Sequence, residues 1–426
     1  MASQEQDKLD AIDIDIVTQE ILLAASEHDV PKLRRLVRQY DRDGNNAANV
    51  KDSETGYTPL HAAIAACEPE DASEANGDAK TADNKVSPET LEKARATVEW
   101  LLQDGAIWND LDANGETPGC LARRLGLKEI YDMMVDAGVR AELLLNRLDG
   151  YEEIVEEDSD NEDGQEDLQV DDQNKEQETA TDGEEAPQLV SAETITQTLK
   201  EDTTDMTEVS QNTYLQSNLT LQNDRILDDD KNGVMMAWET GIMRKSAEAL
   251  LPTPGLRVLN IGHGMGIIDG IFQEQKPSAH HIVEAHPDVL ANMKAKGWAE
   301  KAGVTIHEGR WQDVLPKLVE QGETFDAIYY DTFAESYEDF KDFFTEHVIS
   351  LLESSGKWGF FNGMGADRQI SYDVYQKVVE MDLLEAGFDI DWEDIKVPDL
   401  QDEWTGVRRK YWVVENYRLP LCRYMD

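Results

Sequence analysis

Residues 257–266 are Arg-Val-Leu-Asn-Ile-Gly-His-Gly-Met-Gly, a short apolar run that ends in three alternating glycines. An apolar helical pattern follows, so the sequence predicts a buried strand, a tight glycine turn and the start of a helix. Glycines in such a turn let the backbone approach a ligand without an intervening side chain. A second apolar segment, residues 281–285, carries Glu284, whose carboxylate can accept hydrogen bonds from both ribose hydroxyls of a nucleotide-like cofactor. The combination predicts a cofactor site, although these glycines would also suit an ordinary turn in an α/β domain.

The composition indicates an acidic protein with more than one domain. The chain has 426 residues, which favours two domains or two domains and a linker. Its formal net charge of −50 at pH 7 would repel phosphates, so we expect a basic protein partner and no nucleic acid. No apolar run approaches the roughly 20 residues that cross a bilayer, so no membrane partner is expected. The three cysteines and eight histidines show no metal-ligand spacing, and we predict no metal site.

The N-terminal region has a repeat signature. Residues 58–63 are Thr-Pro-Leu-His-Ala-Ala and match the ankyrin pattern Thr-Pro-Leu-His-x-Ala. Thr58 would cap a helix that begins with Pro59, while His61 bonds back across the turn. A degenerate copy starts at Thr117, 59 residues after the first, and a polar insert at about residues 68–88 accounts for the excess over one repeat. We therefore predict an all-α domain of about three ankyrin repeats in residues 1–150, with residues 125–145 as the closing helices; a generic helical bundle is the alternative.

A strongly acidic tract follows the helical region. Residues 151–187 contain one basic residue, Lys175, and so little apolar surface that burial cannot offset the entropy of ordering. We predict a disordered linker over residues 151–190. A second interpretation is that the tract attracts a basic substrate electrostatically.

From residue 191 to residue 426 the pattern alternates between apolar strands and helical spacing. Such alternation predicts a mostly parallel, doubly wound sheet, whose ligands bind beyond the carboxyl ends of the strands. The expected strands are residues 258–261, 281–285, 304–307, 325–330 and 356–362, with closing strands near 395–397 and at 411–414.

Two carboxylates stand near these strand ends. Residues 233–243 show helical spacing, with Glu239 four residues from both Met235 and Met243. We predict that the two methionines pack against a cofactor and that Glu239 binds a cation, although an exposed Glu on an amphipathic helix has the same spacing. Asp331 follows the strand at 325–330, and with Glu239 it could hold a guanidinium or ammonium group. Asp331 could alternatively cap the next helix.

The third expected strand ends just before Trp311 and Gln312. An aromatic ring at this place can lie against a flat heterocycle while neighbouring polar groups contact its edge. The same tryptophan could be a core residue.

Taken in order, these segments resemble guanidinoacetate N-methyltransferase over about residues 214–424. With the N-terminal ankyrin signature, the whole chain resembles the fungal type IV protein arginine methyltransferases. The resemblance implies a class I, Rossmann-like methyltransferase that moves a methyl group from S-adenosyl-L-methionine to the δ nitrogen of arginine in a protein. His263 departs from the pattern, because an aromatic residue is usual at its place in the glycine turn.

The resemblance also implies a role for individual residues. Glu239 and Asp331 would be the catalytic pair, and Asp331 would also lie beside the methyl donor. Glu284 would bind the ribose, and Trp311 with Gln312 the adenine. The remaining implied cofactor residues are Tyr214, Met235, Met243, Gly262, His263, Gly264, Met265, Gly266, Ile267, Ile268, Ala285 and His286.

The resemblance further implies a ribosomal protein as the basic substrate, a monomer, and a location in cytoplasm and nucleus. Two other functions stay open on the residues alone. One is a small-molecule guanidine N-methyltransferase with an accessory ankyrin domain. The other is a non-catalytic ankyrin adaptor whose cofactor domain is inactive.

Overall fold

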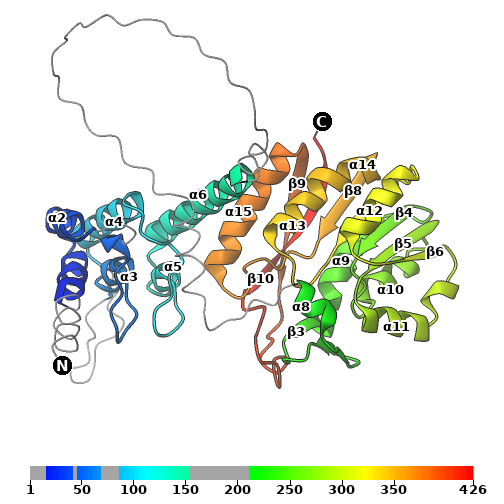
Figure 1. Ribbon diagram of the computed structural model, residues 1–426, viewed down its shortest axis with the longest axis horizontal. Coiled ribbons are helices and arrows are strands. Elements are labelled where there is room, and N and C mark those ends of the chain that lie inside the picture. The colour runs from blue at the N-terminus through cyan, green and yellow to red at the C-terminus, as the bar shows by residue number, and fades with distance from the viewer. Residues whose placement is uncertain (1–15, 42–45, 69–85, 153–210, 426) are drawn as a thin grey trace, which may run out of the picture.

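The computed structural model describes residues 16–41, 46–68, 86–152 and 211–425. They form a helical unit and an α/β unit that lie side by side (Figure 1). Most of the expected linker at 151–190 and most of the polar insert at 68–88 lie outside the described residues. No described helix combines the length and the apolar character needed to span a bilayer.

The helical unit is built from short helices that start where the sequence predicts. Thr58 accepts a hydrogen bond from the His61 backbone, and His61 Nε2 lies 3.0 Å from the Glu116 carbonyl of the second copy. Thr117 caps its helix in the same way. Both predicted Thr-Pro helix starts are confirmed. After a first helix at residues 16–26, the elements are α2 (Val30–Tyr40), η1 (Ala47–Asn49), α3 (Pro59–Ala65), α4 (Pro88–Gln103), α5 (Pro118–Arg124) and α6 (Lys128–Glu152).

The α/β unit contains a seven-stranded sheet in the order β6-β5-β4-β7-β8-β10-β9. The five strands from β6 to β8 are parallel, and β10 is antiparallel to both of its neighbours. This arrangement confirms the predicted doubly wound, mostly parallel sheet. The strands are β4 (Arg257–Ile261), β5 (Ala279–Glu284), β6 (Val304–Glu308), β7 (Phe325–Tyr330), β8 (Leu352–Phe360), β9 (Phe388–Lys396) and β10 (Asn416–Tyr424).

Alternate residues of the central strands enter two different apolar cores. Val258 and Tyr329 pack against the helices of one face, while Leu259 and Tyr330 pack against those of the other. Because side chains alternate across a strand, both faces of the sheet are covered, as a buried parallel sheet requires. One face carries α9 (Thr240–Leu250) and α10 (Ile267–Glu274). The other carries α12 (Trp311–Glu320), α13 (Tyr337–Asp342), η4 (Phe343–Val348), α14 (Ile349–Leu351) and α15 (Gln369–Glu385). Beside β5, Val289 of α11 (Pro287–Ala295) and Trp298 of η3 (Trp298–Glu300) pack on Ile282.

Two sequence-based predictions in this unit are wrong. Residues 233–243 are not one helix: β3 (Gly233–Met236) pairs antiparallel with β2 (Arg225–Leu227), η2 (Ala237–Glu239) follows, and the helix begins at Thr240. The hairpin forms because the Asp228 carboxylate accepts from the backbone and side chain of Asn232 and so closes the turn. Strand β1 (Thr220–Leu221) pairs with the other edge of β2 and completes a three-stranded sheet. Met235, Glu239 and Met243 therefore share no helix face.

The second wrong prediction is the closing strand at 411–414, which is irregular. Val413 donates its backbone N–H to the Ala366 carbonyl, and Trp412 Nε1 donates to Val414 within the same segment. These bonds satisfy the segment outside any ladder. The strand that closes the sheet is β10, and the run at 395–397 overlaps the end of β9, which stops at Lys396.

Helix α15 joins the two units. Its residues Ile370, Val374 and Val378 are buried in the same apolar core as the ankyrin-type helices, and α6 runs along it (Figure 1). Tyr131 of α6 donates a hydrogen bond to Asp373 at 2.5 Å. The approach is close, since a Cβ on Gly119 would lie 1.8 Å from Ile370 Cδ1 and the end of that side chain would have to move.

Candidate active site

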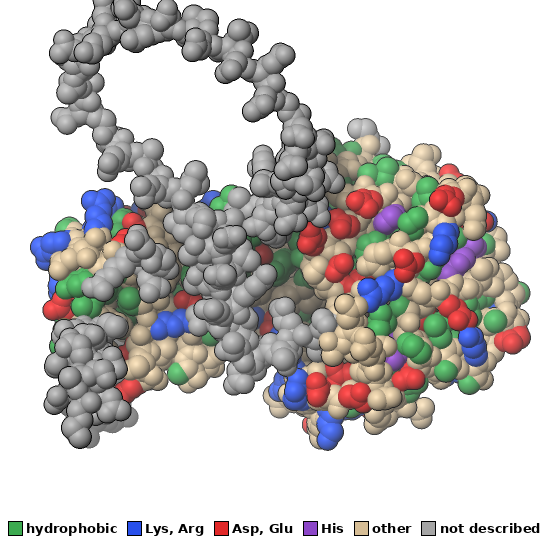
Figure 2. Space-filling model, viewed as in Figure 1, with side chains coloured by type: hydrophobic (Ala, Val, Ile, Leu, Met, Phe, Trp, Pro, Cys, Tyr) green, Lys and Arg blue, Asp and Glu red, His purple; other side chains and the backbone are tan. Residues whose placement is uncertain are grey.

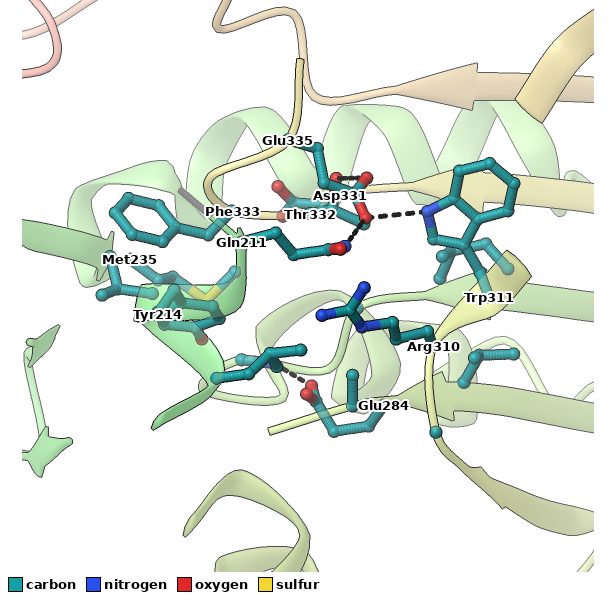
Figure 3. Close-up of a pocket in the computed structure, with 18 residues that line it drawn as sticks. Gln211, Tyr214, Met235, Glu284, Arg310, Trp311, Asp331, Thr332, Phe333 and Glu335 are labelled. Carbon is teal, nitrogen blue, oxygen red and sulfur yellow. Dashed lines mark hydrogen bonds between the residues drawn. The ribbon is translucent and has the colours of Figure 1, made fainter. Parts of the chain in front are cut away.

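Two cavities adjoin at the carboxyl ends of β4, β5 and β7. The first cavity lies beside the glycine turn, and the close-up in Figure 3 shows its lining. Asp331, Thr332 and Glu335 belong to both cavities, so the two spaces share one wall. Eight of the sixteen expected cofactor residues line the first cavity: Tyr214, Met235, Gly262, Gly264, Glu284, Ala285, Trp311 and Asp331.

The glycine turn and Glu284 are locked together. The Glu284 carboxylate accepts from the backbone N–H groups of His263 at 2.9 Å and His286 at 2.7 Å. Gly262 has a φ of 90°, and a Cβ there would lie 1.9 Å from the Asp331 carbonyl oxygen. Only glycine can take this conformation in this space. The turn therefore brings Asp331, which follows β7, and Glu284 to the lining of one cavity.

The other eight expected cofactor residues do not line the cavity. They are Met243, His263, Met265, Gly266, Ile267, Ile268, His286 and Gln312. Met243 and Ile268 belong to the apolar core behind the turn, and the His286 ring packs against Tyr214 with centroids 4.8 Å apart. The Gln312 Oε1 atom is buried and has no hydrogen-bond partner among the described residues.

His263 supports the turn from behind. Its Nδ1 lies 2.6 Å from Asp269, whose other oxygen lies 2.8 Å from His280 Nε2. Burial alone would raise the pKa of Asp269, but the hydrogen bonds from the two histidines hold it at about 2. Histidine can thus occupy this place in the turn because the buried carboxylate pairs with its Nδ1.

The second cavity has a volume of about 250 Å³ and holds the predicted catalytic pair. Glu239 and Asp331 both line it, together with Asn362 and Tyr411. The Glu239 carboxylate accepts from the Tyr411 hydroxyl and from the Met236 backbone at 3.2 Å. Asp331 Oδ2 is buried and has no hydrogen-bond partner among the described residues. The pair thus leaves acceptor capacity for a ligand with N–H donors.

Burial weakens the acidity of both carboxyl groups. It raises the pKa of Glu239 to about 8, and the nearby charge of Asp331 contributes to this shift. The pKa of Asp331 rises to about 7 because of burial and the charge of Asp269. Among the described residues, no lysine, arginine or histidine lines the second cavity. A cation that entered would favour the ionised form of both groups and so bind tightly.

Sequence analysis missed several residues of the site. Asn362 and Tyr411 come from loops far along the chain, and no local motif marks either one. Glu335 and Arg310 lie on the rim of the first cavity, next to predicted residues (Figure 3). Both interpretations of Trp311, as a cavity residue and as a core residue, are correct. It lines the cavity and also packs against Phe343 in the core.

Comparison with known proteins agrees with this geometry. The family described as guanidinoacetate N-methyltransferase matches residues 200–415. Protein arginine N-methyltransferase 2 of Aspergillus fumigatus is 67% identical over 418 residues, which cover 97% of each chain. This chain belongs to the family that contains this protein arginine N-methyltransferase. The expected methyltransferase class, its arginine methylation and its cofactor, S-adenosyl-L-methionine, agree with this membership.

Two solved structures resemble parts of the chain. One is a putative S-adenosylmethionine-dependent methyltransferase from Listeria monocytogenes, with 16% identity and a TM-score of 0.34 over 45% of this chain and 98% of that one. The other is an ankyrin repeat domain from Acinetobacter baumannii, with 24% identity and a TM-score of 0.20 over 28% of this chain and 46% of that one.

The residues of the first cavity suit S-adenosylmethionine. The backbone of the glycine turn lines the cavity at Gly262 and Gly264, and the Glu284 carboxylate can accept further hydrogen bonds beyond its backbone donors. Trp311, which lines the cavity, offers an aromatic surface. These residues would hold the cofactor's nucleoside part, and Asp331 would lie where the two cavities meet.

Proposed function

We propose that the protein methylates the δ nitrogen of arginine in a basic protein and so forms N5-methylarginine. The observation that supports this most directly is the placement of Asp331, which lines both cavities, beside Glu239 in the second. A guanidinium held by these two carboxylates would lie at the wall that the cofactor cavity shares. S-adenosylmethionine supplies a methyl group on a sulfonium sulfur.

The carboxylates would orient the guanidine and receive its proton. Arg side chains pair with carboxylates through two parallel hydrogen bonds, which also fix the plane of the group. When the guanidine nitrogen gains a methyl group it must lose a proton, and Glu239 or Asp331 accepts it. Their pKa values of about 8 and about 7 lie close to neutral pH, where a general base is effective.

The δ position follows from how a carboxylate pair occupies a guanidinium. In this proposal one carboxylate holds the terminal nitrogens, while the other accepts the proton of the chain-bearing nitrogen, whose lone pair then attacks the methyl group. That nitrogen is the δ nitrogen of a protein arginine and the carbon-substituted nitrogen of guanidinoacetate. The same pair of carboxylates would therefore serve both substrates, and a different feature must select between them.

The charge of the second cavity favours a protein arginine over free guanidinoacetate. Guanidinoacetate carries a carboxylate close to its guanidinium, and no basic side chain lines the described cavity to neutralise it. Burying an unpaired carboxylate is costly. An arginine side chain within a protein has a neutral stem and meets no such penalty.

The surface charge supports a basic substrate. The chain has a net charge of −50, and Asp and Glu side chains are spread over the face of the α/β unit seen in Figure 2. Complementary charge speeds the encounter with a basic partner. We propose a ribosomal protein as that partner, a monomeric enzyme, and activity in cytoplasm and nucleus.

Mass spectrometry tests this function. The full chain is incubated with a basic protein extract and labelled S-adenosylmethionine, and fragment ions locate the label on the inner or the terminal nitrogens of arginine. We expect inner-nitrogen methylation and no turnover of free guanidinoacetate. Label on terminal nitrogens would contradict the δ assignment. Turnover of guanidinoacetate alone would favour the small-molecule alternative, and no cofactor binding at all would favour the adaptor.

A further inference from the structure

Glu335 is a half-buried carboxylate that lines both cavities and contacts four separate donors. One oxygen accepts from Trp311 Nε1 at 2.8 Å and from the Gln211 side chain. The other accepts from Thr332 Oγ1 at 2.7 Å and from the Tyr330 hydroxyl. Figure 3 shows Trp311, Thr332 and Gln211 converging on this group. A carboxylate has about four acceptor positions, so these donors fill its capacity.

The donors come from three elements that surround the first cavity. Tyr330 ends β7 and Thr332 lies two residues after it, Trp311 begins α12, and Gln211 lies in α8 (Gln211–Gln216). All four donors are neutral, and burial raises the pKa of Glu335. Within the part of the chain that the structure describes, Glu335 is therefore held by hydrogen bonds that converge on one point of the cavity wall.

The backbone next to Glu335 is strained. Ala334 has a φ of 61°, in the left-handed region that residues other than glycine rarely adopt. Strain of this kind costs about 1–3 kcal/mol and persists where surrounding contacts hold it, often at ligand sites. The contacts of Glu335 help to hold this loop, together with the hydrogen bonds between Ser336 and Asp339 that follow it.

Helix α8 is described from Gln211 onward. Through Tyr214 and Leu215 it forms one wall of the first cavity. Its described contacts include Asn212 with Arg310, and the Tyr214 ring with Phe333 at a centroid distance of 4.9 Å. The hydrogen bond from Gln211 to Glu335 links this wall to the opposite one, which contains Trp311.

We propose that Glu335 is a positioning residue for the cofactor, which holds the Trp311 indole and helix α8 in the arrangement that forms the first cavity. This inference rests on the proposed function of that cavity. Removing the carboxylate would leave Trp311 Nε1 without its acceptor. It would also remove the hydrogen bond that attaches α8 through Gln211. Glu239 and Asp331 would stay in place in the second cavity.

The test measures cofactor affinity and requires no turnover. Binding of S-adenosyl-L-homocysteine to the full chain is measured by calorimetry for the unaltered protein, Glu335→Ala and Glu335→Gln. We expect the alanine variant to bind at least about tenfold more weakly, while the glutamine variant stays within about threefold. The amide can still accept from Trp311 and Gln211 through its oxygen and donate to the hydroxyls of Thr332 and Tyr330.

Asp382→Ala serves as the matched control. Asp382 is also a buried carboxylate that accepts from a tyrosine, Tyr337 at 2.6 Å, but it lines neither cavity. We expect it to lower thermal stability without weakening the binding of S-adenosylhomocysteine. An equal loss of affinity in this control would overturn the inference, because a general structural defect would then explain both variants.

A second measurement covers the case in which Glu335→Ala folds poorly. Gln211→Ala removes only the α8 contact, and we expect faster hydrogen exchange in residues 211–216 and about threefold weaker binding of S-adenosylhomocysteine. Unchanged affinity in Gln211→Ala and Glu335→Ala overturns the inference and leaves the proposed function intact. Failure of the unaltered chain to bind the ligand overturns both.

Discussion

The two adjoining cavities of this protein are assembled in different ways. The first is built mainly from short motifs at successive strand ends: the glycine turn after β4, Glu284 at the end of β5, and Trp311 after β6. The second takes Glu239 from η2, Asp331 from the end of β7, and Asn362 and Tyr411 from later loops. The comparison teaches that a cofactor site can be written into local sequence, whereas a substrate site depends on which loops the fold brings together.

The largest expected effect separates the cavities by function. Glu239→Gln should lower turnover of a protein substrate by about 10²–10³-fold, because the guanidinium loses a charged partner and the base is neutral. Binding of S-adenosylhomocysteine should change little, since Glu239 lines only the second cavity. Asp331→Asn should impair both, because Asp331 lines both. Steady-state kinetics and calorimetry on the two variants measure this, and full activity in either amide variant would refute the assignment.

The next effect concerns the first cavity. Gly262→Ala places a Cβ 1.9 Å from the Asp331 carbonyl at a φ of 90°, so the turn must shift. We expect the affinity for S-adenosylhomocysteine to fall by about 30-fold or more, with a loss of stability of about 1–3 kcal/mol.

Gly270→Ala is the matched control for that change. Gly270 lies in α10, and nothing stands within 4 Å of the Cβ it would gain. Alanine is the better helix former by about 1 kcal/mol, so this variant should be as stable or more stable and bind normally. Normal ligand binding by Gly262→Ala would show that the turn does not shape the cavity.

A smaller effect should appear in the pH dependence. The Tyr411 hydroxyl donates to Glu239 and lowers the pKa of that carboxyl, which burial has raised to about 8. Tyr411→Phe removes the bond, so the pKa of Glu239 should rise further and ionisation should require a higher pH. We expect about tenfold lower activity at neutral pH, partly recovered at alkaline pH.

The control for this variant is Tyr424→Phe, since Tyr424 bonds the carbonyls of Ile349 and Leu352 and lines neither cavity. Its pH–rate profile should match that of the unaltered chain. A profile for Tyr411→Phe that is lowered equally at every pH would contradict an effect on the ionisation of Glu239.

The smallest effect is on stability and has the opposite sign to the effect on turnover. The pKa of Glu239 rises from 4.5 to about 8 on folding, so the folded state binds more protons between these values. Stability therefore falls as the pH rises through this window. Glu239→Gln removes the penalty and should raise Tm by about 3 °C or more at pH 8.5, with a much smaller gain at pH 4.5. Thermal unfolding of both proteins at the two pH values checks this, with Glu248→Gln, at an exposed position, as the control.

Much of the fold could be predicted because its signals are local. Thr58 and Thr117 cap their helices through neighbours three residues away, and the parallel strands are short apolar runs between helical segments. The helix expected at 233–243 failed for the opposite reason. Met235 has the spacing of a helix, but pairing with Ile226 in the neighbouring strand satisfies its backbone instead.

The contact between the two units was also invisible in the sequence. Ile370 and Val374 of α15 have ordinary apolar spacing, which suits burial in either unit. Only the packing of α6 against α15 shows that they complete the core of the ankyrin-type helices. A helix whose opposite faces serve two units gives no signal by which the pattern could assign each face.

Glycines, caps and strand periodicity act over a few residues. The amino-acid sequence alone was therefore sufficient to predict the glycine turn, the place of Glu284 and the doubly wound sheet. The partners of a carboxylate are different, because the chain can bring any loop to it. Tyr411 reaches Glu239 from 172 positions away, and Glu335 collects donors from three elements. The raised pKa values of Glu239 and Asp331 arise only after folding has buried both groups in one cavity wall, because desolvation depends on the whole surrounding structure.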